Sequence, residues 1–209
     1  FPRAYNLDGR WTAGGFKTPT GEKFFRDFQV SDFDVIKRMG FDAVWPMGIL
    51  PIGVRGQTGT GGGSPSSISD HRAVNPDLGT EAEFRSFVAK AHQAGLRVIV
   101  DFVVNHTSLD SKLLAENPDY FVSYQYDGAC PKNDYFESWS NGRKYCVHNG
   151  GFEYGGGVAS WIDTAQVNYS NRGLRDRMTA IVKGWVTKFD VDGFRVDMAY
   201  LALNNVFAR

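Results

Sequence analysis

The chain has no excess of charge of either sign, because its 23 Lys and Arg residues are matched by 23 Asp and Glu residues. Proteins that bind nucleic acid or anionic membranes carry a surplus of basic residues, so we expect neither as a partner. No apolar run approaches the roughly 20 residues of a membrane-spanning helix, and no secretory signal segment is visible. The chain begins at Phe1 without Met, which suggests a processed or trimmed chain.

Cysteine is scarce, with only Cys130 and Cys146 present. Both lie in polar, turn-rich sequence rather than in an apolar strand, which favours a disulfide over two free thiols. A disulfide is typical of proteins from oxidising compartments, so this pair would fit an extracellular or periplasmic location. His148 is the only histidine nearby, and neither the spacing nor the neighbours indicate a zinc site.

The remaining composition is that of a folded globular protein. With 42% hydrophobic residues over 209 positions, the chain is long enough for one sizeable domain. Three helices are predicted from capping signals and from apolar residues at helical spacing. They run from Ser31 to Gly40, from Thr80 to about Ala94 and from Arg172 to Phe189. One side of the last helix carries Leu174, Met178, Ile181, Trp185 and Val186.

Four strands are predicted to alternate with these helices. They cover residues 1–5, 42–46, 96–104 and 191–196, and a further helix begins at Met198. Such alternation indicates an α/β fold with a parallel sheet. The Gly-, Ser- and Pro-rich stretch 53–69 is predicted to be a loop, and residues 107–170 show no sustained periodicity. A structureless stretch of that length is uncommon unless it is functional.

The segment Val191–Asp197 is a short apolar strand that ends in two charged residues. Side chains two residues apart on a strand point to the same face, so Arg195 and Asp197 are predicted to lie side by side. A guanidinium keeps a neighbouring carboxylate ionised, and an ionised, positioned Asp suits nucleophilic displacement at a sugar carbon. The alternative is a buried Arg–Asp pair that only stabilises the fold.

A second segment, Leu96–His106, is a nearly continuous apolar run, as expected for a parallel strand that is buried on both faces. Polar residues appear where it ends, at Asp101, Asn105 and His106. In a chain that alternates strands with helices, polar residues at the C-terminal ends of parallel strands indicate the active-site face of a barrel.

Five segments, in order along the chain, resemble signature stretches of the α-amylase family, glycoside hydrolase family 13. They are residues 41–47, 70–80, 101–106, 164–171 and 193–197. The resemblance implies a (β/α)8 barrel of which about the first four strands are present, with a small loop-rich domain inserted after the third strand. It divides the chain into barrel at 1–106, inserted domain at 107–170 and barrel again at 171–209. The remaining strands are expected from a longer chain or from a second polypeptide.

The same resemblance implies roles for individual side chains. Asp197 matches the catalytic nucleophile, and Arg195 is expected to orient it and keep it ionised. His106 matches a residue that hydrogen-bonds the sugar. Asp101 is expected to organise this sugar-binding site by bonding Arg195. No organic cofactor is implied.

A calcium ion is implied at Asn105, which matches a calcium ligand in many members of the family. Calcium takes about six to eight oxygen ligands, so one carboxamide is not a site by itself. The partner position holds Gln166, where many members have Asp, and Asp163 is the candidate replacement.

Three departures from the family pattern bear on function. Ser66 stands where many members carry an aromatic ring that stacks on the sugar, and Tyr200–Leu201 replaces a common Lys–His pair. The family's general acid and a stabilising Asp come from later strands, so this chain alone is expected to be inactive. The leading interpretation is a fragment of a retaining α-glycoside hydrolase that acts on starch-like oligosaccharides or related disaccharides. Alternatives are a transglycosylase of the same family, a non-catalytic carbohydrate-binding half barrel and a barrel of unrelated chemistry.

Overall fold

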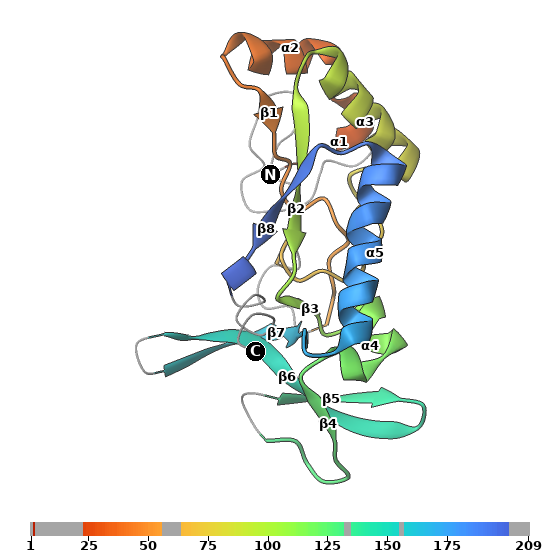
Figure 1. Cartoon of the computed structure of the whole chain (residues 1–209), viewed down its shortest axis with the longest axis vertical. Coiled ribbons are helices and arrows are strands. Elements are labelled where there is room, and N and C mark those ends of the chain that lie inside the picture. The colour runs from red at the N-terminus through yellow and green to blue at the C-terminus, as the bar shows by residue number, and fades with distance from the viewer. Residues whose placement is uncertain (1, 3–22, 56–63, 132–134, 155–156, 201–209) are drawn as a thin grey trace. The chain divides into compact units, whose positions relative to one another are not determined.

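The computed structural model describes residues 2, 23–55, 64–131, 135–154 and 157–200. The chain divides into two compact units, and each is described by itself (Figure 1). The first unit contains Phe1–Pro51, His71–Phe102 and Ala180–Arg195. The second unit contains Ile52–Asp70, Val103–Thr179 and Val196–Arg209.

A three-stranded sheet with the order β1-β2-β8 is the centre of the first unit. β1 (Ala43–Val44) pairs in parallel with β2 (Arg97–Val103), and β8 (Gly193–Asp197) is the other neighbour of β2. The helices are α1 (Phe24–Asp27), α2 (Val30–Arg38), α3 (Glu81–Gln93) and the C-terminal part of α5 (Arg172–Phe189). The strands predicted at 42–46, 96–104 and 191–196 are thereby confirmed, with small differences at their ends.

Two helix starts test the capping signals. Thr80 caps α3 as predicted, since its side chain accepts the Glu83 N–H at 3.2 Å and the Glu83 carboxylate accepts the Thr80 N–H at 2.6 Å. Such a capping box satisfies N–H groups that have no partner inside the helix. The predicted start of α2 at Ser31 was wrong. Asp32 instead accepts the Gln29 N–H at 2.8 Å, and the helix begins one residue before Ser31.

Phenylalanine rings fill the core of the first unit between α1, α2 and α3. The ring centroids of Phe25 and Phe84 are 4.9 Å apart, and those of Phe33 and Phe87 are 5.0 Å apart, both edge to face. This geometry is favoured by the quadrupoles of the rings. The cluster attaches the three short helices to one another more strongly than their own hydrogen bonds do.

α5 has the bounds that the sequence predicts, and its C-terminal part packs on α3 (Figure 1). Trp185 and Phe189 lie against Phe84, with ring centroids 5.7 and 5.2 Å away. Val186 was predicted on the same buried side but is 45% exposed. It follows Trp185 directly, and successive residues are rotated by about 100° around a helix, so the two side chains face different directions.

Asp192 connects α3, β2 and the turn before β8 within the first unit. Its carboxylate accepts the Val98 N–H at 2.7 Å and is bonded to His92 Nε2 at 2.8 Å. Burial alone would raise the pKa of this carboxyl, but these two hydrogen bonds outweigh it and hold the pKa of Asp192 below its ordinary value. The folded state therefore favours the ionised form.

We expect Asp192→Asn to lower the free energy of unfolding at neutral pH by about 1–2 kcal/mol, because charge-assisted hydrogen bonds become neutral ones. Since the folded pKa is depressed, this stability is present above the unfolded pKa and is lost as the pH falls through the folded pKa. Urea unfolding of both proteins over a pH series measures the difference, which should close on acidification. A difference that is the same at acidic and neutral pH would contradict the assignment.

The second unit is mostly antiparallel sheet, which corrects the prediction that residues 107–170 are loop-rich. The strand order is β3-β7-β6-β4, and β5 also pairs with β6. The strands are β3 (His106–Ser108), β4 (Ser123–Gln125), β5 (Tyr135–Ser140), β6 (Arg143–Tyr154) and β7 (Gly157–Gln166). The helical segments are α4 (Lys112–Glu116), the 3-10 turn η1 (Pro118–Tyr120) and the N-terminal part of α5. The division of the chain at residues 106 and 170 stays a prediction.

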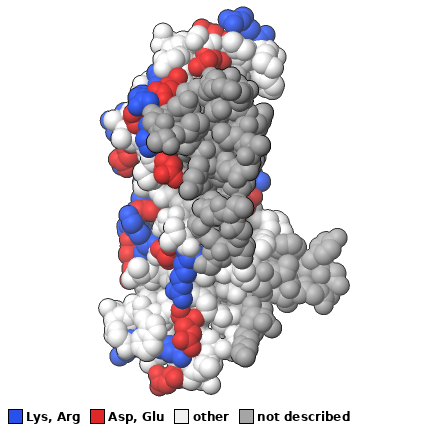
Figure 2. Space-filling model, turned by 180° about the vertical axis from the view of Figure 1, so that it is seen from behind, with Lys and Arg blue, Asp and Glu red and all other residues white. Residues whose placement is uncertain are grey.

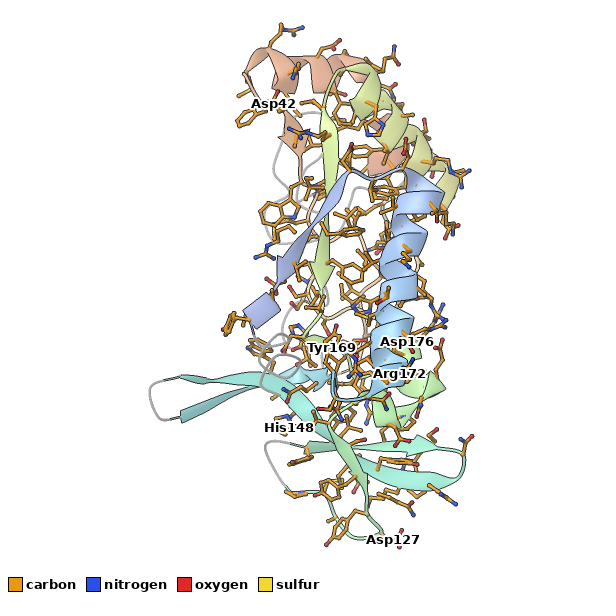
Figure 3. The ribbon with its side chains drawn as sticks, viewed as in Figure 1. Asp42, Asp127, His148, Tyr169, Arg172 and Asp176 are labelled. Atoms are coloured by element: carbon orange, nitrogen blue, oxygen red, sulfur yellow. A yellow bond between two sulfur atoms is a disulfide. The ribbon has the colours of Figure 1, made fainter. Side chains whose placement is uncertain are left out.

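Tyr169 fixes the chain where it passes from β7 to α5. Its hydroxyl donates to the Val104 carbonyl oxygen at 3.0 Å, and the residue is buried (Figure 3). Burial raises the pKa of Tyr169, so the hydroxyl keeps its proton and remains a donor. Two residues later the Asn171 side chain accepts the Leu174 N–H at 3.2 Å, which satisfies an N–H group at the start of α5.

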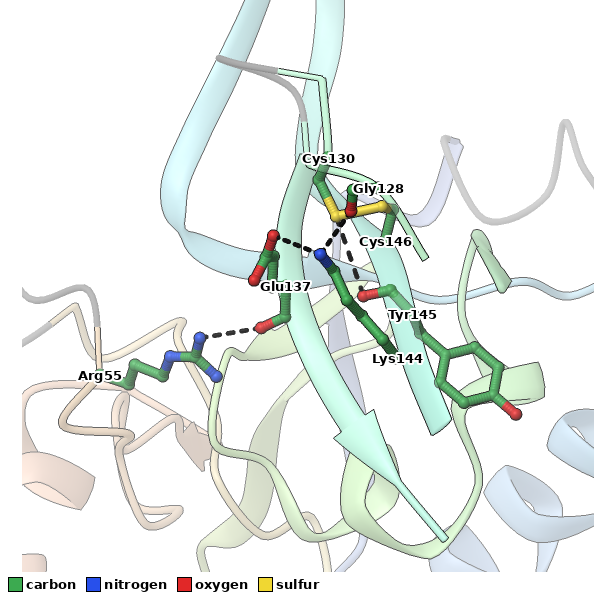
Figure 4. The surroundings of a disulfide bond; sticks show 7 residues. All are labelled: Arg55, Gly128, Cys130, Glu137, Lys144, Tyr145 and Cys146. Atoms are coloured by element: carbon green, nitrogen blue, oxygen red, sulfur yellow. Dashed lines mark hydrogen bonds and ion pairs between the residues drawn. A yellow bond between two sulfur atoms is a disulfide. The ribbon is translucent and has the colours of Figure 1, made fainter. Parts of the chain in front are cut away.

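Cys130 and Cys146 form the predicted disulfide, which attaches the segment before β5 to β6 (Figure 4). The ammonium group of Lys144 lies beside it, 2.8 Å from Glu137 Oε1, and also donates to the Gly128 carbonyl oxygen. One covalent bond and two polar contacts therefore hold this segment against the sheet.

Basic and acidic side chains are interspersed on the face drawn in Figure 2, as the balanced composition predicts. Across the described ranges, no helix is both long and apolar enough to span a bilayer. The strand predicted at 1–5 lies outside the described residues apart from residue 2, and so does the triple glycine at 61–63. The helix predicted to follow Met198 is seen only at residues 199–200.

Candidate active site

A pocket of about 220 Å³ lies within the second unit and contains three of the predicted site residues. Its lining consists of Ser64, Ser66, His106, Trp161, Asp163, Thr164, Asp197 and Met198. The predicted nucleophile Asp197 and the predicted sugar-binding residue His106 therefore share one pocket with Asp163. The lining combines aromatic rings, hydroxyl groups and carboxylates.

His106 is held in place by the sheet. It opens β3, pairs with Gln166 at the end of β7 and is 3% exposed. Its Nδ1 lies 3.4 Å from the Asn105 side-chain nitrogen, and the Asn105 carbonyl accepts the Val167 N–H at 3.2 Å. An imidazole anchored at Nδ1 has a fixed orientation, which leaves Nε2 as the nitrogen suited to meeting a ligand.

A bulge in β7 brings Asp163 and Thr164 to the pocket. Gly150 of β6 pairs with Trp161, while the preceding Asn149 pairs with Ala165, so residues 162–164 have no partner on β6. Bulges of this kind bend a strand and redirect its side chains, and they recur next to functional sites. The alternation of an ordinary strand would not place Asp163 and Thr164, which are neighbours in sequence, on the same pocket.

Gly150 is required at the base of this bulge. A side-chain Cβ at that position would overlap the Thr164 hydroxyl and lie 3.1 Å from the His106 Cβ. Any larger residue would therefore push on two side chains of the pocket lining. The glycine is explained here by close approach of side chains rather than by an unusual backbone angle.

The wall that carries Ser64 and Ser66 is attached to the bulge. The Ser66 N–H donates to Ser64 Oγ at 3.2 Å, and the Ser67 hydroxyl donates to the Asp163 carbonyl oxygen at 2.7 Å. Since serine side chains are small, this wall leaves space in the pocket instead of filling it.

Asp197 is the last residue of β8, and the chain turns directly after it. Met198 has φ of 49°, in the left-handed region that side chains rarely adopt, and helical residues follow at 199–200. A strand that ends in a sharp turn holds its last side chain out from the sheet. This position is consistent with a carboxylate that acts at the end of a barrel strand.

Arg195 and Asp101 form an ion pair in the first unit, with Arg195 Nη1 3.0 Å from Asp101 Oδ1. The prediction that these two residues bond is confirmed. Asp101 is 7% exposed, and the guanidinium carbon of Arg195 lies 4.9 Å from the Trp45 ring centroid. A carboxylate and an aromatic ring therefore hold the guanidinium together. Arg195 is joined to Asp197 through a single residue of β8.

Calcium binding at Asn105 and Asp163 stays a prediction. Asp163 lines the pocket, whereas Asn105 is buried next to it in sequence to His106 and is not part of the lining. Within the described part of the chain, no group of three or more His, Cys, Asp or Glu side chains is placed to hold a metal ion. These residues do not make a calcium site on their own, and no step of the function proposed below uses a metal.

The sequence analysis missed three residues of the pocket lining: Trp161, Thr164 and Met198. Thr164 opens the segment 164–171 that resembles the family, and Met198 follows the nucleophile, so both were within reach. Trp161 lies in a region that was predicted to have no regular structure. The signal for it is chemical, since an aromatic ring close to a family signature segment is a candidate platform for sugar.

An α/β barrel sheet, together with a pocket that holds a carboxylate at the end of a strand, defines the class of carbohydrate-processing barrel enzymes. The comparison with known families is specific: residues 30–206 match the family described as alpha amylase, catalytic domain. The chain therefore belongs to the α-amylase family, glycoside hydrolase family 13. The α/β sheet of the first unit is part of the family's (β/α)8 barrel.

Individual relatives agree with this assignment. Alpha-amylase 3 of Dictyoglomus thermophilum is 29% identical over 177 residues, which is 81% of this chain and 31% of that protein. An alpha-glucosidase of Pediococcus pentosaceus is 30% identical over 178 residues, 79% of this chain and 29% of that protein. The solved structure of the maltogenic alpha-amylase AmyB from Thermotoga neapolitana has 32% identity and a TM-score of 0.68, covering 95% of this chain and 38% of that one. This chain thus spans about a third of the length of the relatives it matches.

Proposed function

We propose that this chain carries the nucleophile of a retaining α-glycoside hydrolase that acts on α-glucosidic bonds of starch-like oligosaccharides or related disaccharides. The observation that supports this most is that Asp197 and His106, which match family signature segments, line the same pocket. The relatives named alpha-amylase and alpha-glucosidase support the same substrate class.

In this proposal, the Asp197 carboxylate attacks the anomeric carbon of the bound sugar. The glycosidic bond breaks, and the leaving oxygen takes a proton from a general acid while a covalent glycosyl ester forms on Asp197. Water, deprotonated by the same second carboxylate, then releases the sugar with its α configuration retained. Retaining enzymes place the two carboxyl groups about 5–5.5 Å apart. We propose that the second carboxylate comes from barrel strands beyond this chain, so that the isolated chain does not catalyse the reaction.

The other charged and polar residues would support this step. Arg195, itself fixed by Asp101 and Trp45, would keep positive charge near Asp197 and favour its ionised form. His106 would hydrogen-bond a sugar hydroxyl next to the bond that breaks. A hydrogen bond of this kind speeds the reaction only if it is stronger in the transition state than with bound substrate.

The complete barrel protein that carries this chain tests the proposal. We expect it to hydrolyse maltotriose with retention of the α configuration, followed by proton NMR of the newly formed anomer, while the isolated chain releases no sugar. A β product would contradict a retaining mechanism. Longer oligosaccharides as the main products would favour the transglycosylase instead. Binding without turnover, measured by isothermal titration of maltotriose, would favour a non-catalytic carbohydrate-binding protein.

A further inference from the structure

We infer that Trp161 is the stacking platform of the pocket, and that the pocket takes a neutral, unphosphorylated pyranose against the indole ring. This inference rests on the function proposed above and adds to it the residue that recognises the apolar face of the sugar. It starts from the composition of the pocket lining rather than from the signature segments.

Aromatic carbon is concentrated at one corner of the pocket. The ring centroids of Trp161 and His106 are 4.9 Å apart with an angle of 60° between the ring planes. The other lining residues offer no ring: they are Ser64, Ser66, Asp163, Thr164, Asp197 and Met198. Among the described residues that line the pocket, the indole is therefore the one broad, flat apolar surface.

The two halves of this lining match the two kinds of surface on a pyranose. A hexose in its chair form has a face of C–H groups and a rim of hydroxyl groups. The C–H face is suited to an aromatic platform, and the rim is suited to hydroxyls, an imidazole nitrogen and carboxylates. Ser64 and Ser66 lie in the same pocket as Trp161 and are too small to occupy the space over its ring.

The charge of the lining narrows the class of sugar. Asp163 and Asp197 are the acidic residues among the eight described residues of the lining, which include neither Lys nor Arg. A phosphate or carboxylate on the sugar would be placed close to these carboxylates and would be repelled. We therefore expect an uncharged glucosyl unit at this position.

The backbone around Trp161 is shaped to hold the ring in this place. The Trp161 carbonyl oxygen accepts the Thr164 hydroxyl at 3.1 Å, which closes the bulge behind it. Across the ladder, Trp161 pairs with Gly150, where no side chain competes with the lining. A platform that is already ordered before the sugar binds loses little entropy on binding.

The test uses the complete barrel protein with Asp197→Asn, so that binding is measured without turnover. In this background, Trp161→Ala is expected to weaken maltotriose binding by about tenfold to a hundredfold in isothermal titration, because loss of a stacked ring has effects of this size. Trp161→Phe, which keeps a smaller ring, should recover part of the affinity. The matched control is Trp139→Ala, which removes a tryptophan that is 66% exposed and lies outside the pocket lining.

The outcomes separate this inference from the function on which it rests. Trp161→Ala within twofold of the parent, with an unchanged melting temperature, would overturn the stacking role even if the enzyme hydrolyses maltotriose. Equal or tighter binding of maltose 6′-phosphate than of maltose would overturn the neutral-sugar class. Conversely, loss of binding in Trp161→Ala but not in Trp161→Phe supports the platform even if the wild-type protein binds sugar without hydrolysing it.

Discussion

Asp197→Asn is expected to lower kcat of the complete barrel enzyme on maltotriose by at least about a thousandfold, the size of effect seen when a catalytic nucleophile is removed. The amide has nearly the shape of the carboxylate and still fits at the end of β8, but it is a poor nucleophile toward the anomeric carbon. The loss should appear in kcat rather than in KM, because the interaction that is removed is made in the transition state. Initial rates of reducing-sugar release measure both constants.

Asp163→Asn is the matched control for this result. It makes the same chemical change in the same pocket, at a residue to which we assign no bond-making role. We expect a much smaller change in kcat for this variant. If Asp197→Asn retained more than a tenth of the wild-type rate, or if Asp163→Asn lost as much activity as Asp197→Asn, the assignment of Asp197 as nucleophile would be wrong.

Trp185→Ala should lower the free energy of unfolding by about 3–5 kcal/mol, as large-to-small substitutions of buried aromatic residues do. Trp185 is 2% exposed and packs on Phe84 of α3 and on Phe189. Its indole N–H also donates to the His71 carbonyl oxygen at 2.7 Å. Removing the ring leaves a cavity at the contact between α3 and α5 and a buried carbonyl without this donor.

Two further variants separate the contributions of the Trp185 side chain. Trp185→Phe keeps most of the ring and loses the hydrogen bond, so we expect an intermediate loss of stability. Trp139→Ala truncates a largely exposed tryptophan and should stay within about 0.5 kcal/mol of wild type. Urea unfolding followed by far-UV circular dichroism measures all three. A Trp185→Ala protein as stable as Trp139→Ala would show that the first unit's core does not depend on this residue.

The elements that sequence reasoning predicted well are those with local causes. Thr80 and Glu83 form a capping box within one turn, and the apolar spacing of α5 is complete between Arg172 and Phe189. β2 was predicted because a strand buried in an α/β sheet is apolar along its length. In each case the residues that determine the element lie inside it or next to it.

The sheet of the second unit was missed because its strands are defined by their partners rather than by alternation. Its strands are rich in Gly, Asn and Tyr, and the register of β6 with β7 changes at the bulge after Asn149. One local signal was present and overlooked. Asn141–Gly142, with φ of 49° and 73°, is the two-residue turn between β5 and β6, and Asn-Gly is a strong hairpin sequence.

The candidate site divides in the same way. Asp197 and His106 were found because each lies in a short signature segment, and the Arg195–Asp101 bond was found because both residues end predicted strands. Trp161 reaches the pocket only through the bulge in β7, which depends on contacts with Gly150 and Thr164 across the sheet. No pattern within the strand itself indicates that placement.

The disulfide between Cys130 and Cys146 gives the β5–β6 hairpin a property that its hydrogen bonds do not. The chain from Cys130 to Cys146 is a covalent ring, and the Asn141–Gly142 turn at its tip is exposed. Exposed turns are the preferred sites of proteolytic cleavage. A single cut at this turn would leave the two pieces of the protein linked through sulfur, and the strand ladder between β5 and β6 would still hold them in register. The hairpin can therefore be cut once without being lost, and the damage would become visible on a gel only after the sulfurs are reduced.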